Sequence, residues 1–307
     1  MPEERIELTK QEKQKGKSLV NLLEPLSFPR GPAMKNRFML APLTNSQSHA
    51  DGTLSDEEFR WLTMRAAGGF GLTMTCAAHV QAIGQGFPGQ LGVFDDRHVP
   101  GLSRLAAAIK QQDSVAILQL HHAGMRSPAE LIGESPVCPS DEETGSRQLR
   151  HGEVEALVED FIAGAQRAEA AGFDGVEIHG AHGYILCQFL SDEINRRDDE
   201  YGGSLENRCR ILLQIIDGIR QRCGSDFQLG LRLSPERFGM HLGEIIEVAK
   251  RLMREDQLDF LDMSLWDVWK EPEEDAFRGR ALIDYFTELE RGRTRLGVAG
   301  KIRTPQE

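Results

Sequence analysis

The sequence predicts an α/β fold built from repeated strand-helix units around a parallel sheet. From Asn36 onward, short apolar runs alternate with amphipathic segments, and no linker interrupts the alternation. Polar and ionisable side chains collect where a predicted strand ends, as they do at the carboxyl-terminal face of an α/β barrel. We therefore expect one (β/α)8 TIM barrel over residues 21–307, preceded by a polar tail at residues 1–20.

Short apolar runs predict seven strands, with amphipathic helices between and after them. The strands are expected at residues 38–41, 71–75, 115–120, 175–178, 228–233, 260–263 and 296–299. The helices are expected at residues 56–67, 100–112, 154–171, 205–222, 243–254 and 280–289.

Seven strands are one fewer than a closed barrel needs, so the expected barrel lacks its last strand-helix unit. Its first and seventh strands would then have open edges, which favour association into a homo-oligomer. Either the natural chain continues past Glu307, or this is a truncated relative that covers the gap in another way.

Local signals mark several helix ends. Ser55 precedes an acidic first turn and Ser204 precedes the helix at 205–222, each in the place of an N-cap residue. Gly68 and Gly172 follow predicted helices where a C-terminal glycine belongs.

Composition narrows the class of partner. The formal net charge of −12 argues against a nucleic-acid or anionic membrane surface, which leaves a small molecule. Five cysteines without a close pair indicate a reduced, cytoplasmic protein. The polar amino terminus is unlike a signal segment, and no run of about 18 apolar residues predicts a membrane helix.

The strongest functional signal lies at the end of the predicted strand 175–178. His179, His182 and Tyr184 follow it within six residues, which predicts a carbonyl clamp with a proton donor beside it. Zinc binding is an alternative, but no cysteine pair or nearby carboxylate supplies further ligands at familiar spacing. A purely structural role, with each ring bonded to backbone groups, is the other alternative.

Five segments in order resemble the old yellow enzyme family of FMN-dependent NAD(P)H oxidoreductases. They are residues 36–44, 65–72, 118–124, 179–184 and 199–208, and the similarity runs from about Leu22 to Pro305. The resemblance implies an enzyme that binds FMN, is reduced by NADPH or NADH, and reduces the C=C bond of an α,β-unsaturated carbonyl or similar electron-poor alkene.

The resemblance also implies roles for single residues. His179 and His182 would hold the substrate carbonyl oxygen, and Tyr184 would donate a proton to the α-carbon. The expected FMN contacts are Ala41, Pro42, Leu43 and Thr44 along the ring, Ala77 and Gln119 near it, and Arg232 at the edge that becomes negative on reduction. Thr44 has the alternative of an ordinary strand-end hydroxyl. Arg232 has that of a salt bridge with a carboxylate such as Glu177.

The phosphate site departs from the family pattern. Relatives present paired glycines after the seventh strand, whereas this chain has Gly300 followed by Lys301, whose charge would replace an amide contact. The glycine-arginine phosphate contact that follows the eighth strand in relatives is absent from the sequence. Two alternatives therefore stay open. One is a truncated, non-catalytic barrel or partner subunit without FMN, and the other is a fragment of a larger flavoenzyme of the dienoyl-CoA reductase or amine dehydrogenase type.

Overall fold

The computed structural model describes residues 21–141 and 145–303, so the predicted polar tail lies outside the described residues. Within them, the centre is a parallel sheet whose seven strands follow one another in chain order. They are β1 (Met39–Leu40), β2 (Leu72–His79), β3 (Val115–His121), β6 (Gly175–Gly180), β7 (Gln228–Leu233), β8 (Phe260–Ser264) and β9 (Arg295–Ala299). This order confirms the predicted barrel wall, with β1 and β9 at its two edges.

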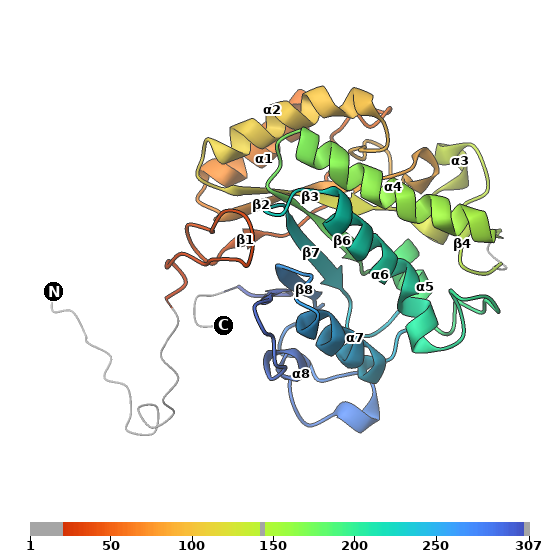
Figure 1. The fold of residues 1–307 in the computed structure, drawn as a ribbon. Helices are drawn as coiled ribbons and strands as arrows, with labels where there is room; N and C mark the ends of the chain where they lie inside the picture. Colours follow the sequence, from red (N-terminus) through yellow and green to blue (C-terminus); the bar gives the residue numbers. More distant parts are fainter. Residues whose placement is uncertain (1–20, 142–144, 304–307) are drawn as a thin grey trace, which may run out of the picture.

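Long helices cover the outer face of the sheet (Figure 1). They are α1 (Asp56–Ala67), α2 (Val99–Lys110), α4 (His151–Ala170), α6 (Leu205–Arg222) and α7 (Leu242–Arg254), close to five of the predicted ranges. The N-cap predictions are confirmed, because the Ser55 hydroxyl accepts from the N–H of Glu58 and the Ser204 hydroxyl from that of Asn207.

The prediction of a helix at residues 280–289 is wrong in extent, since only α8 (Asp284–Thr287) forms there. The N–H of Leu282 donates to the carbonyl of Lys270 at 2.8 Å, which holds the preceding residues in an irregular connection. The sequence patterns also missed several short elements. These are α3 (Ala129–Ile132), α5 (Ile185–Leu190), β4 (Val137–Cys138), β5 (Arg147–Gln148) and the 3-10 turns η1 (Ala82–Gly84), η2 (Asp96–His98), η3 (Gly124–Arg126) and η4 (Asp275–Phe277).

The sheet is buried on both faces, as expected of a parallel sheet in an α/β fold. A large core packs between the sheet and the helices. A smaller one, which includes Met34, Leu72 and Phe260, occupies the inner face. The amino-terminal segment packs against this smaller core. Leu26 pairs with Met34, and the ring centre of Phe28 lies 5.8 Å from that of Phe260.

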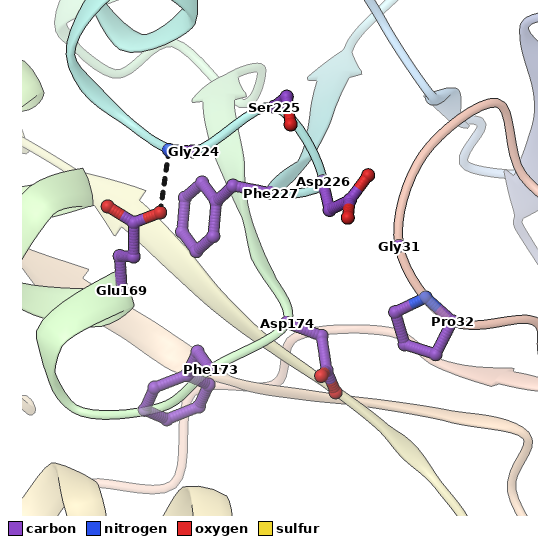
Figure 2. A pocket seen from close by; sticks show the side chains of 9 residues that line it. All are labelled: Gly31, Pro32, Glu169, Phe173, Asp174, Gly224, Ser225, Asp226 and Phe227. Atoms are coloured by element: carbon purple, nitrogen blue, oxygen red, sulfur yellow. Dashed lines mark hydrogen bonds between the residues drawn. The ribbon is translucent and has the colours of Figure 1, made fainter.

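A shallow hollow at the amino end of the strands, about 610 Å³ in volume, is built from the connections that precede β6 and β7 (Figure 2). Glu169 bridges the two connections by accepting from the N–H of Gly224 at 2.7 Å. Asp174 is already bonded to Lys110 and to the N–H of Ala116. In α/β barrels, residues at the amino end of the strands contribute to stability, whereas catalytic residues lie at the carboxyl end.

None of the described helices combines the length and the apolar character that crossing a membrane requires.

Candidate active site

One cavity of about 420 Å³ at the carboxyl ends of the strands brings most of the predicted site residues together. Its lining is Pro42, Leu43, Thr44, Ala77, Phe87, Gln119, His179, His182, Tyr184 and Arg232. All but Phe87 were expected from the sequence. Ala41, Gly300 and Lys301 do not line it.

Gly300 and Lys301 follow the end of β9. A Cβ at Gly300 would lie 2.1 Å from the carbonyl oxygen of Leu265, so only glycine allows this approach. The Lys301 ammonium lies 3.5 Å from a carboxylate oxygen of Asp267, which neutralises part of its charge. Its contribution to a phosphate site stays a prediction.

Strand register decides the polar floor of the cavity. Gln119 of β3 lies opposite Glu177 of β6, and its side-chain amide donates to the Glu177 carboxyl at 2.6 Å. Arg232 of β7 lies opposite Asp262 of β8, with Nε 3.2 Å from Oδ2. The alternative given for Arg232, a salt bridge with a carboxylate such as Glu177, is therefore met by Asp262, because residues in register on neighbouring strands point to the same face.

The two acids of this floor face different neighbours. Burial raises the pKa of both Glu177 and Asp262, and the guanidinium of Arg232, which lies in register with Asp262, opposes that rise at Asp262. The Asp262 charge raises the pKa of Glu177 further, to about 8, so Glu177 holds a proton at neutral pH. The floor then presents a neutral carboxyl beside Gln119 and a paired guanidinium.

A left-handed turn places the two histidines and the tyrosine. His182 has φ +62° and Gly183 φ +72°, and a non-glycine residue in this region is held there by its surroundings. The N–H of His182 donates to the Ser234 hydroxyl at 3.0 Å, and Arg126 donates to the His182 carbonyl. The turn brings the Tyr184 ring within 5.2 Å of the His179 ring.

The two histidines form a chain that ends at Ser264. Nε2 of His179 lies 3.2 Å from Nδ1 of His182, and Nε2 of His182 lies 2.7 Å from the Ser264 hydroxyl oxygen. Burial lowers the pKa of His179 well below its ordinary value and that of His182 to about 4. Both rings are therefore neutral near pH 7.

Two neutral imidazoles carry two N–H groups, and one of these lies between the rings. Only one of the two outer nitrogens, Nδ1 of His179 and Nε2 of His182, can then be a donor. When the Ser264 hydroxyl donates to His182, the remaining N–H is on Nδ1 of His179, which is buried without a hydrogen-bond partner among the described residues. The pair then has one N–H without a partner among the described residues, rather than the two free donors expected of a simple clamp.

Several residues around the site were not assigned from the sequence. Phe87 has no local signal. Ser264 and Arg126 act through contacts between distant loops. Asp262 did carry a local signal in the sequence, because a carboxylate within a short buried strand requires a partner.

This donor set suits a flavin ring. Gln119 can both donate and accept at a pyrimidine edge, Ala77 leaves room for a flat ring, and Arg232 has a buried Nε without a hydrogen bond among the described residues. An α/β barrel with these groups at its carboxyl end belongs to the class of flavin-binding oxidoreductases.

Comparisons with known proteins agree with this class. Residues 21–297 match the model of the NADH:flavin oxidoreductase / NADH oxidase family. The chain belongs to this family, that of the old yellow enzymes, whose members use FMN with NADH or NADPH. The sequence-based prediction of family and cofactor is confirmed.

Among similar sequences, the "Probable NADH-dependent flavin oxidoreductase YqiG" of Bacillus subtilis is 36% identical over 93% of this chain and 80% of its own length. An NADPH dehydrogenase of Bacillus licheniformis is 36% identical over 79% of this chain and 72% of its own. The old yellow enzyme homologue of Zymomonas mobilis superposes with a TM-score of 0.80 and 28% identity, over 92% of this chain and 83% of that one.

Some similar proteins are much longer. The chain spans 47% of 2-naphthoyl-CoA reductase, with a TM-score of 0.83 and 28% identity over 93% of this chain. It spans 28% of the NADH:fumarate oxidoreductase of Klebsiella pneumoniae, at 37% identity over 80% of this chain.

Proposed function

We propose that this protein uses NADH or NADPH to reduce the C=C bond of an α,β-unsaturated carbonyl or similar electron-poor alkene. The observation that carries the proposal is the sharing of one cavity by His179, His182 and Tyr184 with Gln119 and Arg232. A hydrogen-bonding site for a carbonyl oxygen and a proton donor then lie beside the groups that suit a flavin.

Different side chains would bind FMN and the substrate carbonyl oxygen. When bound, FMN supplies hydride chemistry with NADH or NADPH as the reductant. Gln119 and Arg232 would hold the polar edge of the ring, and the guanidinium would favour negative charge there. The N–H on Nδ1 of His179 would donate to the substrate carbonyl oxygen, and so draw charge from the alkene.

His182 would add a second donor only if its Nε2 carries a proton. That requires its ring to exchange Ser264 for the substrate and the bond to His179 to break, or the pair to take up one proton. Negative charge developing on the substrate oxygen favours proton uptake. Tyr184 would place a proton on the α-carbon, which completes the reduction.

The two half-reactions separate these roles. Tyr184→Phe should slow alkene reduction by about 10²-fold, since a positioned general acid contributes at least that much. Flavin reduction by NAD(P)H should keep its rate, because it needs no phenol. Stopped-flow absorbance measures both steps, and Tyr285→Phe, whose hydroxyl bonds the Phe277 carbonyl, is the matched control. Equal losses in both half-reactions would remove the role given to Tyr184.

A visible spectrum tests the rival proposal of a non-catalytic barrel. The protein is recorded as purified, after addition of FMN, and then after addition of NADPH or NADH without oxygen. A yellow protein that bleaches supports the enzyme. A protein that takes up no FMN supports the rival.

A further inference from the structure

The cavity of about 420 Å³ that contains Gln119 and Arg232 is called the flavin cavity below. A second cavity of about 400 Å³, which we call the outer pocket, lies next to it. It lies between the loop that follows β7 and the loop that follows β8, and it shares His182 and Tyr184 with the flavin cavity. His182 and Tyr184 therefore form part of the wall of both cavities, which places the outer pocket next to the expected position of the substrate carbonyl.

The charges that line the outer pocket are mostly positive. Arg126, Arg237 and Lys270 face a single carboxylate, that of Glu236. Lys270 and Glu236 form a close ion pair, and Glu236 also accepts from the N–H of Glu273, so this cation and this anion neutralise each other. Two guanidinium groups remain, in a protein whose net charge is −12.

Neither guanidinium has a close acidic partner within the described part of the chain. Arg126 donates to the His182 carbonyl and lies 5.1 Å from the centre of the Tyr184 ring. Arg237 approaches a carboxylate only at 3.8 Å, from its Nε to Glu273, and its side chain stays 47% exposed. Both retain N–H groups that a ligand can use.

The rest of the wall is apolar and aromatic. Phe238 and Trp266 both lie near Arg237, whose guanidinium carbon is 5.8 and 5.7 Å from their ring centres. Trp266 is 70% exposed, unusual for so large an apolar surface. These contacts hold the Arg237 guanidinium beside a flat apolar surface, an arrangement suited to an organic anion rather than a free inorganic ion.

We propose that the outer pocket binds a carboxylate carried by the alkene substrate, with Arg237 as its main partner and Arg126 as the second. The inference rests on the proposed alkene reduction and adds a substrate class, the electron-poor alkenes that bear a carboxylate near the reacting bond. A guanidinium matches a carboxylate with two parallel N–H groups, and the paired bonds fix the orientation of the ligand. The carbonyl end then meets His179 while the charged end meets Arg237.

A matched pair of substrates tests the charge alone. The full-length, FMN-loaded protein is assayed with 4-oxopent-2-enoate and with its methyl ester. Arg237→Gln should raise the KM of the acid about tenfold more than the KM of the ester, and Arg237→Lys should recover part of the loss. Arg278→Gln, an exposed arginine paired with Asp275, is the matched control and should change neither value.

Binding without turnover gives an independent measurement. Quenching of tryptophan fluorescence by 4-oxopent-2-enoate should saturate in the parent protein, and Trp266→Phe should remove most of the signal. The dissociation constant should rise about tenfold in Arg237→Gln. Equal constants for parent and variant would overturn the proposal.

The kinetic outcomes separate the two proposals. Failure of the parent to reduce either alkene contradicts the proposed function, while the fluorescence measurement still decides whether the pocket binds the carboxylate. Reduction of both alkenes with an unchanged acid-to-ester ratio in Arg237→Gln contradicts only the outer-pocket proposal. A rise confined to the KM of NADH or NADPH would assign the arginine to the phosphates of the reductant, and would also overturn it.

Discussion

Acid should destabilise this protein through histidines that are buried without charge, and His122 offers the clearest test. It lies just beyond β3 and is 1% exposed. Its Nε2 lies 3.0 Å from the Gln81 side-chain oxygen, and its Nδ1 accepts from the N–H of Gly124 at 3.0 Å. Burial lowers its pKa from 6.5 to about 3, and the neighbouring His79 adds to the effect.

The sign and the size follow from proton binding. Below pH 6.5 the unfolded chain gains a proton at His122 that the native protein does not bind, so the free energy of unfolding falls as pH falls toward 3. Each pH unit below 6.5 costs about 1.4 kcal/mol, so the loss between pH 7 and pH 5 is about 2 kcal/mol for this histidine.

The perturbation is His122→Gln, which keeps a donor and an acceptor in place of the ring. Urea unfolding at pH 7, 6 and 5, with saturating FMN, measures the free energy of unfolding by tryptophan fluorescence. The loss between pH 7 and pH 5 should be smaller than in the parent by about 2 kcal/mol. Other titrating groups are common to both proteins and cancel in this difference.

A second histidine provides a control of opposite sign. His151 is exposed, and the hydrogen bond that its ring donates to the Glu200 carboxylate raises its pKa, so its charge stabilises the native protein at low pH and that stabilisation is lost as pH rises through the folded pKa. His151→Gln should therefore make the protein more sensitive to acid, and His122→Gln less so. An unchanged pH dependence in His122→Gln would refute the buried, neutral state assigned to that ring.

Two further predictions concern the cavity. Ser264→Ala removes the partner of His182 and should slow alkene reduction about three- to tenfold, the value of one net hydrogen bond, without changing flavin reduction. ¹⁵N NMR of the histidines should show altered tautomers. An unchanged spectrum would contradict the hydrogen-bond chain from His179 through His182 to Ser264. Glu177→Leu should raise the FMN dissociation constant about tenfold by releasing Gln119, whereas Glu177→Gln should stay within about twofold because the native carboxyl is neutral. Flavin fluorescence titration measures the FMN dissociation constant of both variants. A large loss of FMN affinity in Glu177→Gln would mean that the native carboxyl is charged.

Local patterns explain what could be predicted well. The helix at residues 205–222 was predicted with the observed bounds because its N-cap, Ser204, bonds within one turn. Strand β7 was predicted over its full length because Leu229, Leu231 and Leu233 alternate along it. The group His179, His182 and Tyr184 was found because one short turn holds all three residues. Signals of this kind depend on residues a few positions apart.

The partners across the site depended on longer distances. A salt bridge of Arg232 was the alternative to its flavin role, with Glu177 as the example of a partner; the pair forms with Asp262, since the register between β7 and β8 decides which carboxylate lies opposite. The bond between His182 and Ser264 joins residues 82 positions apart. No spacing in the sequence encodes either contact.

The sequence by itself determined the strand-helix order, the helix caps, the family and the identity of most residues around the flavin cavity. Only the tertiary structure decided which acid pairs with Arg232, that His179, His182 and Ser264 form one chain of contacts, and that two loops place Arg126 and Arg237 around an outer pocket. The physical reason is that secondary structure follows from periodicity and backbone hydrogen bonds between near neighbours. Ion pairs, tautomers and cavities follow instead from the register and packing of strands that meet only in the folded chain.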